Sequence, residues 1–309
     1  MKNLKECNFC KGKEFRELFL ARDKKIQSKE IFRVVKCKKC GLIFLNPQPS
    51  FKELEEHYPK EYYSLGRIQD TNSMKTRLKL FLYKVYSDPM RKNWARKIIF
   101  SPFLPYLRGA PIIKGAKLLD VGCGSGQFIY EMKKFGLEVY GVEPGDFDEK
   151  SAEEFGLNIK KKDLLSAKYP RESFDIVTMS HVLEHTSDPS ENLKEVYKVL
   201  RKGGLFIVRV PNYNSLSFSL FGKNWYGLDI PRHLYNFSDK ILIKRLESEG
   251  FRIKRIAYDS RPYQFSSSIK QMLHLSNISF KIMNLLFLPL TYAVNLLKKG
   301  DQIEIYCKK

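Results

Sequence analysis

Four cysteines near the start of the chain have the type and spacing of metal ligands. They form two Cys-x-x-Cys pairs, Cys7 with Cys10 and Cys37 with Cys40, and 26 residues separate the pairs. Two such pairs can bring four thiolates around one tetrahedral Zn²⁺. A redox-active Cys-x-x-Cys is the alternative, but that motif lies between a strand and a helix, and a second copy is unexpected. Because four thiolates leave no open coordination position, the pattern predicts a structural zinc site.

A glycine-rich turn further along the chain has the composition of a ligand-binding loop. Gly122, Gly124 and Gly126 alternate directly after the apolar run Lys117–Val121 and before a helical pattern of apolar residues. Glycines permit a tight turn and let backbone N–H groups approach a ligand closely. Dinucleotides and S-adenosylmethionine are the two ligand classes that bind at such a turn.

Two details favour S-adenosylmethionine, and a third suits both ligands. The dinucleotide fingerprint is Gly-x-Gly-x-x-Gly, whereas the spacing here is Gly-x-Gly-x-Gly. Asp120 precedes the turn, where its charge opposes a pyrophosphate but suits the ammonium group of a methionine moiety. Glu143 follows the next strand-like run and is placed to bind a ribose diol, a feature that both classes share.

The same residues carry a resemblance to a known family. Leu119–Gly126, Gly141–Pro144, Phe174–Val177 and His181–His185 together resemble the motifs of class I S-adenosylmethionine-dependent methyltransferases, and the resemblance runs from about Lys114 to the C-terminus. It implies a methyltransferase with S-adenosylmethionine as its cofactor. The residues expected to bind this cofactor are Asp120, Gly122, Cys123, Gly124, Gly126, Phe128, Glu143, Pro144, Asp163, Leu164, Ser180 and His181.

Individual roles follow from residue type. Asp163 is expected to accept a hydrogen bond from the adenine amino group, with Leu164 as an apolar wall; a helix-capping Asp163 is the competing interpretation. Methyl transfer to a hydroxyl or amine benefits from a base whose pKa is near neutral, which makes His181 the first candidate and His233 the second. His185 is expected to orient its loop by hydrogen bonding.

A long aromatic segment, residues 212–238, is expected to overhang the strand ends. Its Pro231-Arg232-His233-Leu234 run resembles the signature of a methyltransferase subgroup, and by that resemblance Trp225, Arg232 and His233 shape the acceptor pocket. The structural alternatives are that Trp225 fills the core and that His233 caps the helix opened by Ser238. The four-cysteine segment resembles the zinc-ribbon heads found before some methyltransferases of cell-surface and natural-product pathways.

The elements that must position these residues alternate between strand and helix after residue 114. Alternation of this kind predicts an α/β fold, here a doubly wound, mostly parallel, seven-stranded sheet of the Rossmann-like methyltransferase type. Ligands bind beyond the carboxyl ends of the strands in such sheets. The expected strands are Lys117–Val121, Glu138–Val142, Asn158–Lys161, Phe174–Met179, Leu205–Val210, Phe251–Tyr258 and Ile303–Tyr306.

Three segments divide the chain in this interpretation. Residues 1–50 form a zinc-ribbon domain with a hairpin between the cysteine pairs, and residues 51–113 form a helical linker or cap that includes an amphipathic helix over Lys75–Phe100. Residues 114–309 form the S-adenosylmethionine-binding domain, with insertions at 212–238 and 262–300. The cysteines make zinc the second expected cofactor, in a structural role.

Composition sets limits on location and partners. The 309 residues are 43% hydrophobic and 29% charged, as in an ordinary globular protein. The net charge is +21, and residues 1–114 hold 26 of the 55 Lys and Arg but only 11 of the 34 Asp and Glu. A basic front half can attract nucleic acid, anionic lipid or phosphorylated substrates, although a lysine-rich composition accounts for it equally well. No signal peptide is visible, and six cysteines without secretory context predict reduced thiols or metal in a cytoplasmic protein.

An uncharged segment, Ile282–Leu297, bears on membrane contact. It is short for a membrane span and contains Pro289. The favoured interpretation is a buried or substrate-covering helical pair. The alternative is a peripheral membrane contact, with Lys281 and Lys298 on anionic headgroups.

Two classes of function remain. The first is methylation of a small-molecule or lipid-linked acceptor, such as a sugar or polysaccharide precursor. The alternative is a nucleic-acid-directed methyltransferase or binding module that docks RNA on the basic zinc-ribbon half. An Asn-Pro-Pro-Tyr-type motif would favour methylation of a base amino group, and its place is taken by Met179–Val182, which favours the first class. The sequence does not specify the acceptor, the methylated atom or the oligomeric state.

Overall fold

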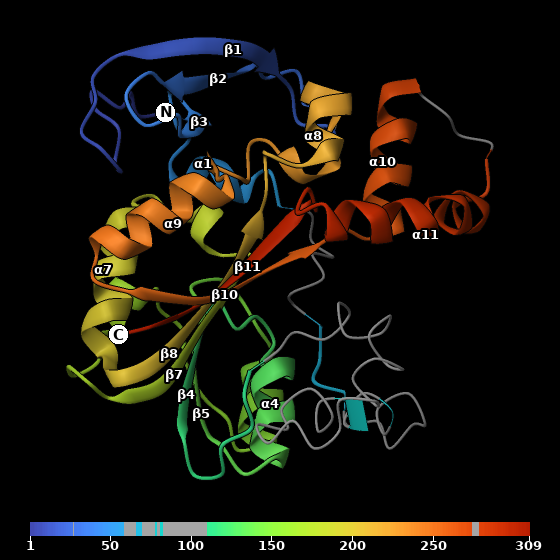
Figure 1. Ribbon diagram of the computed structural model, residues 1–309. Helices are drawn as coiled ribbons and strands as arrows, with labels where there is room; N and C mark the ends of the chain where they lie inside the picture. The colour runs from blue at the N-terminus through green and yellow to red at the C-terminus, as the bar shows by residue number, and fades with distance from the viewer. Residues whose placement is uncertain (27, 59–65, 70–77, 79–80, 83–109, 274–277) are drawn as a thin grey trace. The chain divides into compact units, whose positions relative to one another are not determined.

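The computed structural model describes residues 1–26, 28–58, 66–69, 78, 81–82, 110–273 and 278–309 (Figure 1). The amphipathic helix expected over Lys75–Phe100 lies almost wholly outside these residues. Two compact units make up the chain. The first unit contains Met1–Tyr62, Met179–Lys198 and Val208–Lys309, and the second contains Tyr63–Thr178 and Val199–Ile207.

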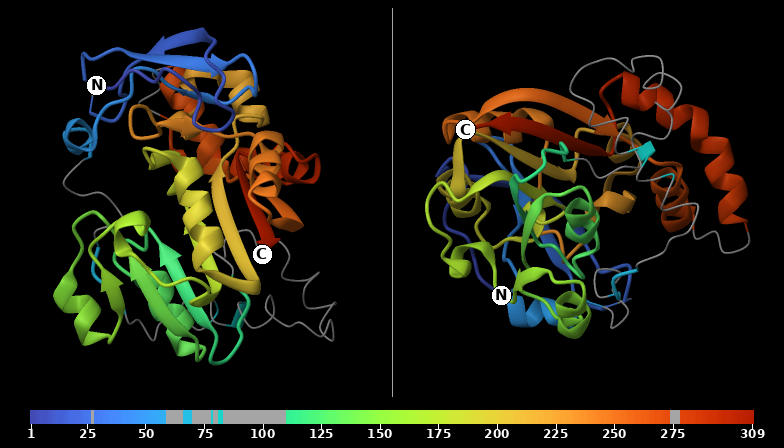
Figure 2. Two further views of the ribbon diagram at one scale, coloured as in Figure 1. Left: turned by 90° about the vertical axis from the view of Figure 1, so that its left-hand side faces the viewer. Right: turned by 90° about the horizontal axis from the view of Figure 1, so that it is seen from below.

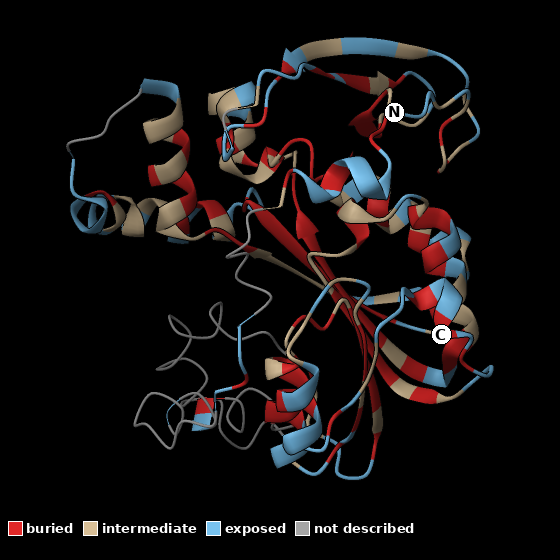
Figure 3. Cartoon of the chain, turned by 180° about the vertical axis from the view of Figure 1, so that it is seen from behind, coloured by how far each residue is buried: buried red, intermediate tan, exposed pale blue. Residues whose placement is uncertain are grey.

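A seven-stranded sheet has the order β10-β11-β8-β7-β4-β5-β6. Strands β4, β5 and β6 pair in parallel, and β10 pairs with β11 antiparallel. Apolar side chains of the strands are buried along most of their length (Figure 3). The strands are β4 Lys117–Val121, β5 Glu138–Val142, β6 Asn158–Lys160, β7 Phe174–Ser180, β8 Leu200–Pro211, β10 Arg252–Asp259 and β11 Gln302–Lys308. All seven predicted strands, and the predicted fold class, are therefore confirmed.

Helices follow the strands of the second unit in chain order, as a doubly wound fold requires. The helix α4, Gln127–Lys134, begins directly after Gly126 and buries Phe128, Ile129 and Met132 at helical spacing. It lies against β5 (Figure 2). Shorter helices, α5 at Glu149–Glu154 and α6 at Leu164–Ala167, complete this series.

A second sheet lies in the first unit and contains strands from distant parts of the sequence. Its order is β1-β2-β3-β9, all antiparallel, with β1 Phe15–Ala21, β2 Phe32–Cys37, β3 Ile43–Leu45 and β9 Tyr235–Asn236. The predicted hairpin between the cysteine pairs corresponds to β1 and β2. Strand β9 is a finding that the sequence pattern did not predict: Phe44 pairs with Tyr235 across nearly 200 residues of chain.

Capping side chains begin α1, α7 and α9 of the first unit. Ser50 forms a capping box with Glu53 at the start of α1, Phe51–Glu55. Asp188 accepts hydrogen bonds from the backbone N–H groups of Ser190 and Glu191 at the start of α7, Pro189–Val199. Ser238 caps α9, Asp239–Ser248, through the N–H of Ile241.

The helices α10, Pro262–Leu273, and α11, Phe280–Leu296, pack against each other (Figure 2). One side of α11 faces solvent: Leu285 and Leu286 are each 71% exposed and Leu296 is 84% exposed. The predicted burial of this segment is wrong for these leucines. Among the residues that the structure describes, no helix has both the length and the apolar character needed to span a membrane.

Candidate active site

The glycine turn follows β4 in the second unit. Gly122, Gly124 and Gly126 have φ values of 66°, 56° and 86°, a region that residues with a side chain rarely adopt. At Gly126 a Cβ would also lie only 2.8 Å from Cδ1 of Ile159. Glycine is therefore favoured at Gly126 by the backbone conformation, and a Cβ there would also displace the side-chain ends of Ile159 and Leu157.

Glu143 is hydrogen-bonded directly to this turn. Val121 and Val142 are partners in the parallel pairing of β4 and β5, so the segments that follow both strands emerge side by side. Glu143 Oε2 accepts a hydrogen bond from the Gly124 N–H at 2.8 Å, and Oε1 accepts one from the Gly145 N–H at 2.9 Å. Each carboxylate oxygen has a further lone pair, so the side chain retains acceptor capacity for two hydroxyl groups.

Asp120 lies beneath the turn. Its side chain is fully buried, and Oδ1 accepts a 2.6 Å hydrogen bond from the Thr178 hydroxyl on β7. This hydrogen bond ties the carboxyl group of β4 to the neighbouring strand β7. Thr178 is a site residue that the sequence analysis missed, because nothing in its neighbours marks it as a partner of Asp120.

The other expected cofactor residues of the second unit divide between packing and surface positions. Cys123, Phe128 and Leu164 are buried, whereas Pro144 and Asp163 are exposed. Asp163 caps α6 by accepting the Ser166 N–H at 2.8 Å. Ser180 and His181 belong to the first unit.

His181 and Glu184 form a pair in the first unit. His181 follows β7 with a φ of 56°, an uncommon conformation for a non-glycine residue, and its N–H donates to the carbonyl of Arg209 at 2.9 Å. Its Nδ1 lies 3.2 Å from Oε1 of Glu184. Burial raises the pKa of Glu184, but the hydrogen bond from His181 and the nearby histidines outweigh burial, so the pKa is lower than usual.

His185 and His233 lie beside this pair, with ring centroids 4.7 Å apart. His185 Nδ1 lies 2.9 Å from the carbonyl oxygen of Arg232, and His233 Nδ1 lies 2.9 Å from that of Gly227. Burial lowers the pKa of His185 and lowers that of His233 to about 4. Both rings are therefore neutral near pH 7.

Arg232 is 1% exposed and uses all of its donors within the protein. Two N–H groups bind Asp23, at 2.7 and 3.0 Å, two bind Oδ1 of Asp229, at 2.8 and 3.1 Å, and one binds the carbonyl of His57 at 2.6 Å. Burial raises the pKa of Asp229, but the charge of His233 when it is protonated at low pH, together with the hydrogen bonds and charge of Arg232, prevails and holds this pKa below the usual range. In this structure Arg232 joins segments of the protein.

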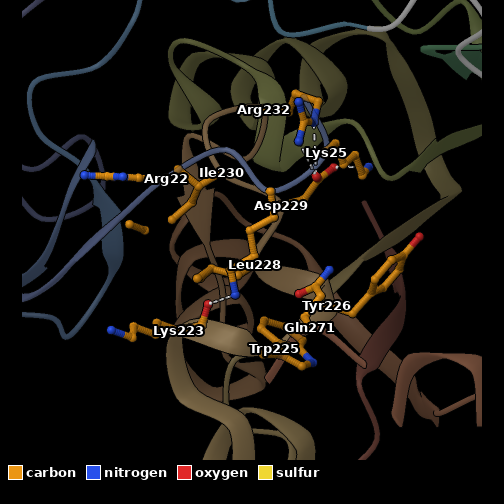
Figure 4. Close-up of a pocket in the computed structure, with 12 residues that line it drawn as sticks. Arg22, Lys25, Lys223, Trp225, Tyr226, Leu228, Asp229, Ile230, Arg232 and Gln271 are labelled. Carbon is orange, nitrogen blue, oxygen red and sulfur yellow. Dashed lines mark hydrogen bonds and ion pairs between the residues drawn. The ribbon is translucent and has the colours of Figure 1, made fainter. Parts of the chain in front are cut away.

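A small pocket, with about 30 Å³ of free volume, lies against this network (Figure 4). Trp225 forms part of its lining and is 2% exposed, and its indole N–H donates to Asp301 at 2.7 Å. Asp229, which also lines the pocket, has its Oδ2 4.0 Å from Nε2 of His233. The cationic residues of the lining are Arg22, Lys24, Lys25, Lys223 and Arg232.

The four cysteines converge as their spacing predicts. Cys7 Sγ lies 3.6 Å from Cys40 Sγ, Cys10 Sγ lies 3.5 Å from Cys37 Sγ, and all four sulfurs lie within 4.8 Å of one another. Four thiolates around zinc, with bonds of about 2.3 Å, are separated by about 3.8 Å. The two turns are alike: the Lys11 N–H donates to the Cys7 carbonyl, and the Gly41 N–H donates to the Cys37 carbonyl. This geometry suits one tetrahedral ion.

Comparison with known proteins identifies the family. The profile of a family described as "Methyltransferase domain" matches residues 90–255. A ubiquinone biosynthesis O-methyltransferase of Bradyrhizobium sp. is 31% identical over 164 residues, which are 51% of this chain and 64% of that protein. Another, of Pseudomonas fluorescens, is 27% identical over 182 residues, which are 55% of this chain and 73% of that protein.

A solved structure of a SAM-dependent methyltransferase from Archaeoglobus fulgidus is 24% identical, covers 74% of this chain and 99% of its own, and gives a TM-score of 0.44, too low to add to the argument. The family profile alone spans more than half of the chain. The chain therefore belongs to this methyltransferase family, whose methyl donor is S-adenosylmethionine.

Proposed function

From this family membership we propose that the protein transfers the methyl group of S-adenosylmethionine to a hydroxyl oxygen of a small-molecule or lipid-linked acceptor. The observation that carries the proposal is the His181–Glu184 pair, which has the arrangement of a general base and the carboxylate that orients it. The names of the relatives, both O-methyltransferases, support oxygen as the methylated atom.

The proton on His181 is positioned by Glu184. A buried carboxylate at Nδ1 favours the tautomer with its proton on that nitrogen, so Nε2 keeps the lone pair that can accept the acceptor's hydroxyl proton. The His181 side chain is 29% exposed, which leaves the ring accessible to an acceptor. His233, with a pKa of about 4, is a weaker base at neutral pH.

Residues of the second unit support the donor assignment. The bound donor supplies an electrophilic methyl group on a sulfonium. Glu143 has acceptor capacity for the two ribose hydroxyls, and Asp120 provides a negative charge that suits the ammonium group. The glycine turn exposes backbone to the ligand, and aligning the reactants contributes most of the rate enhancement in an in-line displacement.

The charges of the small pocket at Asp229 and Arg232 support one class of acceptor. Its lining has five cationic side chains, of which Arg232 and Lys25 pair with Asp229. Such a surface favours an acceptor that carries a phosphate or another anionic group, as many activated sugar precursors do.

The exposed apolar side of α11 supports contact with an anionic membrane surface, where a lipid-linked acceptor would be found. Leu285 and Leu286 face solvent, and Lys281 and Lys298 flank the helix. Flotation with anionic liposomes tests this. Leu286→Glu should abolish co-flotation, whereas Leu220→Glu, a change at another leucine that is 59% exposed, should not. Wild-type protein that stays at the bottom of the gradient contradicts the membrane contact.

We also propose that the four cysteines hold a structural zinc ion, which their sulfur geometry supports. Calorimetric binding of S-adenosylmethionine, followed by a labelled-methyl screen of cell-extract fractions, tests the main proposal. His181→Gln should retain donor binding and lose about 10²–10⁴-fold in turnover. A product that ribonuclease degrades would instead indicate the nucleic-acid alternative, and unchanged turnover would remove His181 as the base.

A further inference from the structure

Glu184, His185 and His233 form a second group of side chains that could act as metal ligands. Glu184 and His185 lie in a short 3₁₀ helix, Leu183–His185, and His233 lies in the 212–238 segment. Each offers one ligand atom, and these three atoms lie within 4.8 Å of one another. The group is separate from the four cysteines.

The hydrogen bonds of the two histidines fix where each ring carries its proton. Nδ1 of His185 faces the Arg232 carbonyl, and Nδ1 of His233 faces the Gly227 carbonyl, both at 2.9 Å. A carbonyl oxygen only accepts, so each Nδ1 carries a hydrogen and each Nε2 keeps its lone pair. The Tyr58 hydroxyl, 3.2 Å from His185 Nδ1, is compatible with this as a second acceptor. Metal-binding histidines are oriented in the same way, by a carbonyl or carboxylate at the other nitrogen.

Glu184 adds a third acceptor. Its Oε1 faces His181, whereas Oε2 is buried and has no hydrogen-bond partner among the described residues. The carboxylate is 0% exposed. Burying a carboxylate oxygen without a hydrogen-bond donor costs free energy. Solvent water cannot readily take the place of the missing donor, because no surface of this carboxylate is accessible.

Among the residues that the structure describes, no group donates a hydrogen bond to these lone pairs. Asp229 Oδ2 lies 4.0 Å from His233 Nε2, beyond hydrogen-bond range, and is itself an acceptor that binds Lys25. Within the described part of the chain, lone pairs from two imidazoles and one carboxylate therefore lie close together without a hydrogen-bond donor, and a cation would satisfy all three.

We propose that Glu184, His185 and His233 bind a divalent first-row transition-metal ion, with zinc as the preferred ion. Two imidazoles and a carboxylate are a ligand set that zinc adopts with one position left open. Ligand atoms of a four-coordinate zinc site lie about 3.3–3.5 Å apart, so small side-chain rotations would complete the shell. The open position would bind an oxygen atom of the acceptor; this role rests on the proposed function, whereas the metal site does not.

Metal content of the full-length, tag-free chain tests the proposal. After incubation with zinc and desalting, wild-type protein should contain two zinc ions per chain by mass spectrometry of the element. Glu184→Gln and His233→Gln should each contain one. His57→Gln is the matched control, because His57 is also a buried histidine but its nitrogens face Asp23 and Glu30, and it should retain two.

Cobalt substitution in the wild-type chain gives a measurement that needs no variant to fold. The cysteine site gives intense thiolate-to-cobalt charge-transfer bands, and the second equivalent should add only weak ligand-field bands. One zinc per wild-type chain, a Glu184→Gln protein that keeps two, or a cobalt titration that ends at one equivalent overturns the proposal. Neither readout needs methyl transfer, so an inactive protein with two metals contradicts only the proposed function.

Discussion

Arg232 allows a sharp test of how the 212–238 segment is held. Replacing it with methionine removes all five hydrogen bonds and leaves Asp23 and Asp229 buried, with His57 beside Asp23 and with Lys25 and His233 beside Asp229. Removing one partner of a buried ion pair costs about 3–5 kcal/mol in the free energy of unfolding. Arg232→Lys keeps the charge but has three donors in place of five, so we expect it to cost roughly 2–3 kcal/mol.

Urea denaturation at neutral pH measures both losses. Arg201→Met is the matched control, because Arg201 pairs with Asp175 where the two side chains are 44% and 32% exposed. An exposed pair contributes about 0–1 kcal/mol, so this variant should unfold close to the wild type. If Arg232→Met is no less stable than Arg201→Met, the reasoning that the buried network holds the segment is refuted.

Three further outcomes follow from the same structure. Burial raises the pKa of Asp23, but its hydrogen bonds from Arg232 prevail and keep this pKa below the unfolded value of about 3.9. The free energy of unfolding should therefore decrease as the pH falls through about 4 and lower. Asp23→Asn should flatten this part of a plot of the urea midpoint against pH. Gly126→Ala should lower the melting temperature more than Gly115→Ala, because Gly115 has a similar φ of 77° but open space at Cβ; equal losses would contradict the close-packing argument. Cys37→Ser should remove one zinc ion and lower the melting temperature, and unchanged metal content would contradict the proposed cysteine site.

Local sequence patterns were sufficient to predict most strands of the seven-stranded sheet. Several strands contain short apolar runs, and β4 and β5 begin and end where the sequence predicts. The start of β8 differs from the prediction: the expected strand begins at Leu205, whereas the observed strand begins at Leu200 and contains Gly203 and Gly204. Glycine marks a break in a helix and an irregularity in a strand equally well, so composition alone does not distinguish them.

Tertiary pairing could not be predicted in the same way. The strand β9 has only two residues, so no periodicity marks it, and its partner lies at Ile43–Phe44. No local sequence feature near Asp23 indicates that its partner is the buried guanidinium of Arg232. Glu184 lies within the His181–His185 motif, but its proposed roles depend on its burial, which the sequence of a short 3₁₀ helix does not specify.

These long-range pairings explain what an N-terminal segment without a catalytic group contributes to the site. The Leu45 N–H donates to the Leu234 carbonyl, β3 pairs with β9 immediately afterwards, and the Asn8 side chain donates to the hydroxyl of Tyr235. His233 precedes these anchored residues in the chain, so its backbone position is set by the sheet that the cysteines close. A zinc ion bound by the cysteines would therefore influence the proposed chemistry by holding His233 in position, because general bases and metal ligands lose function when they are displaced by about 1 Å.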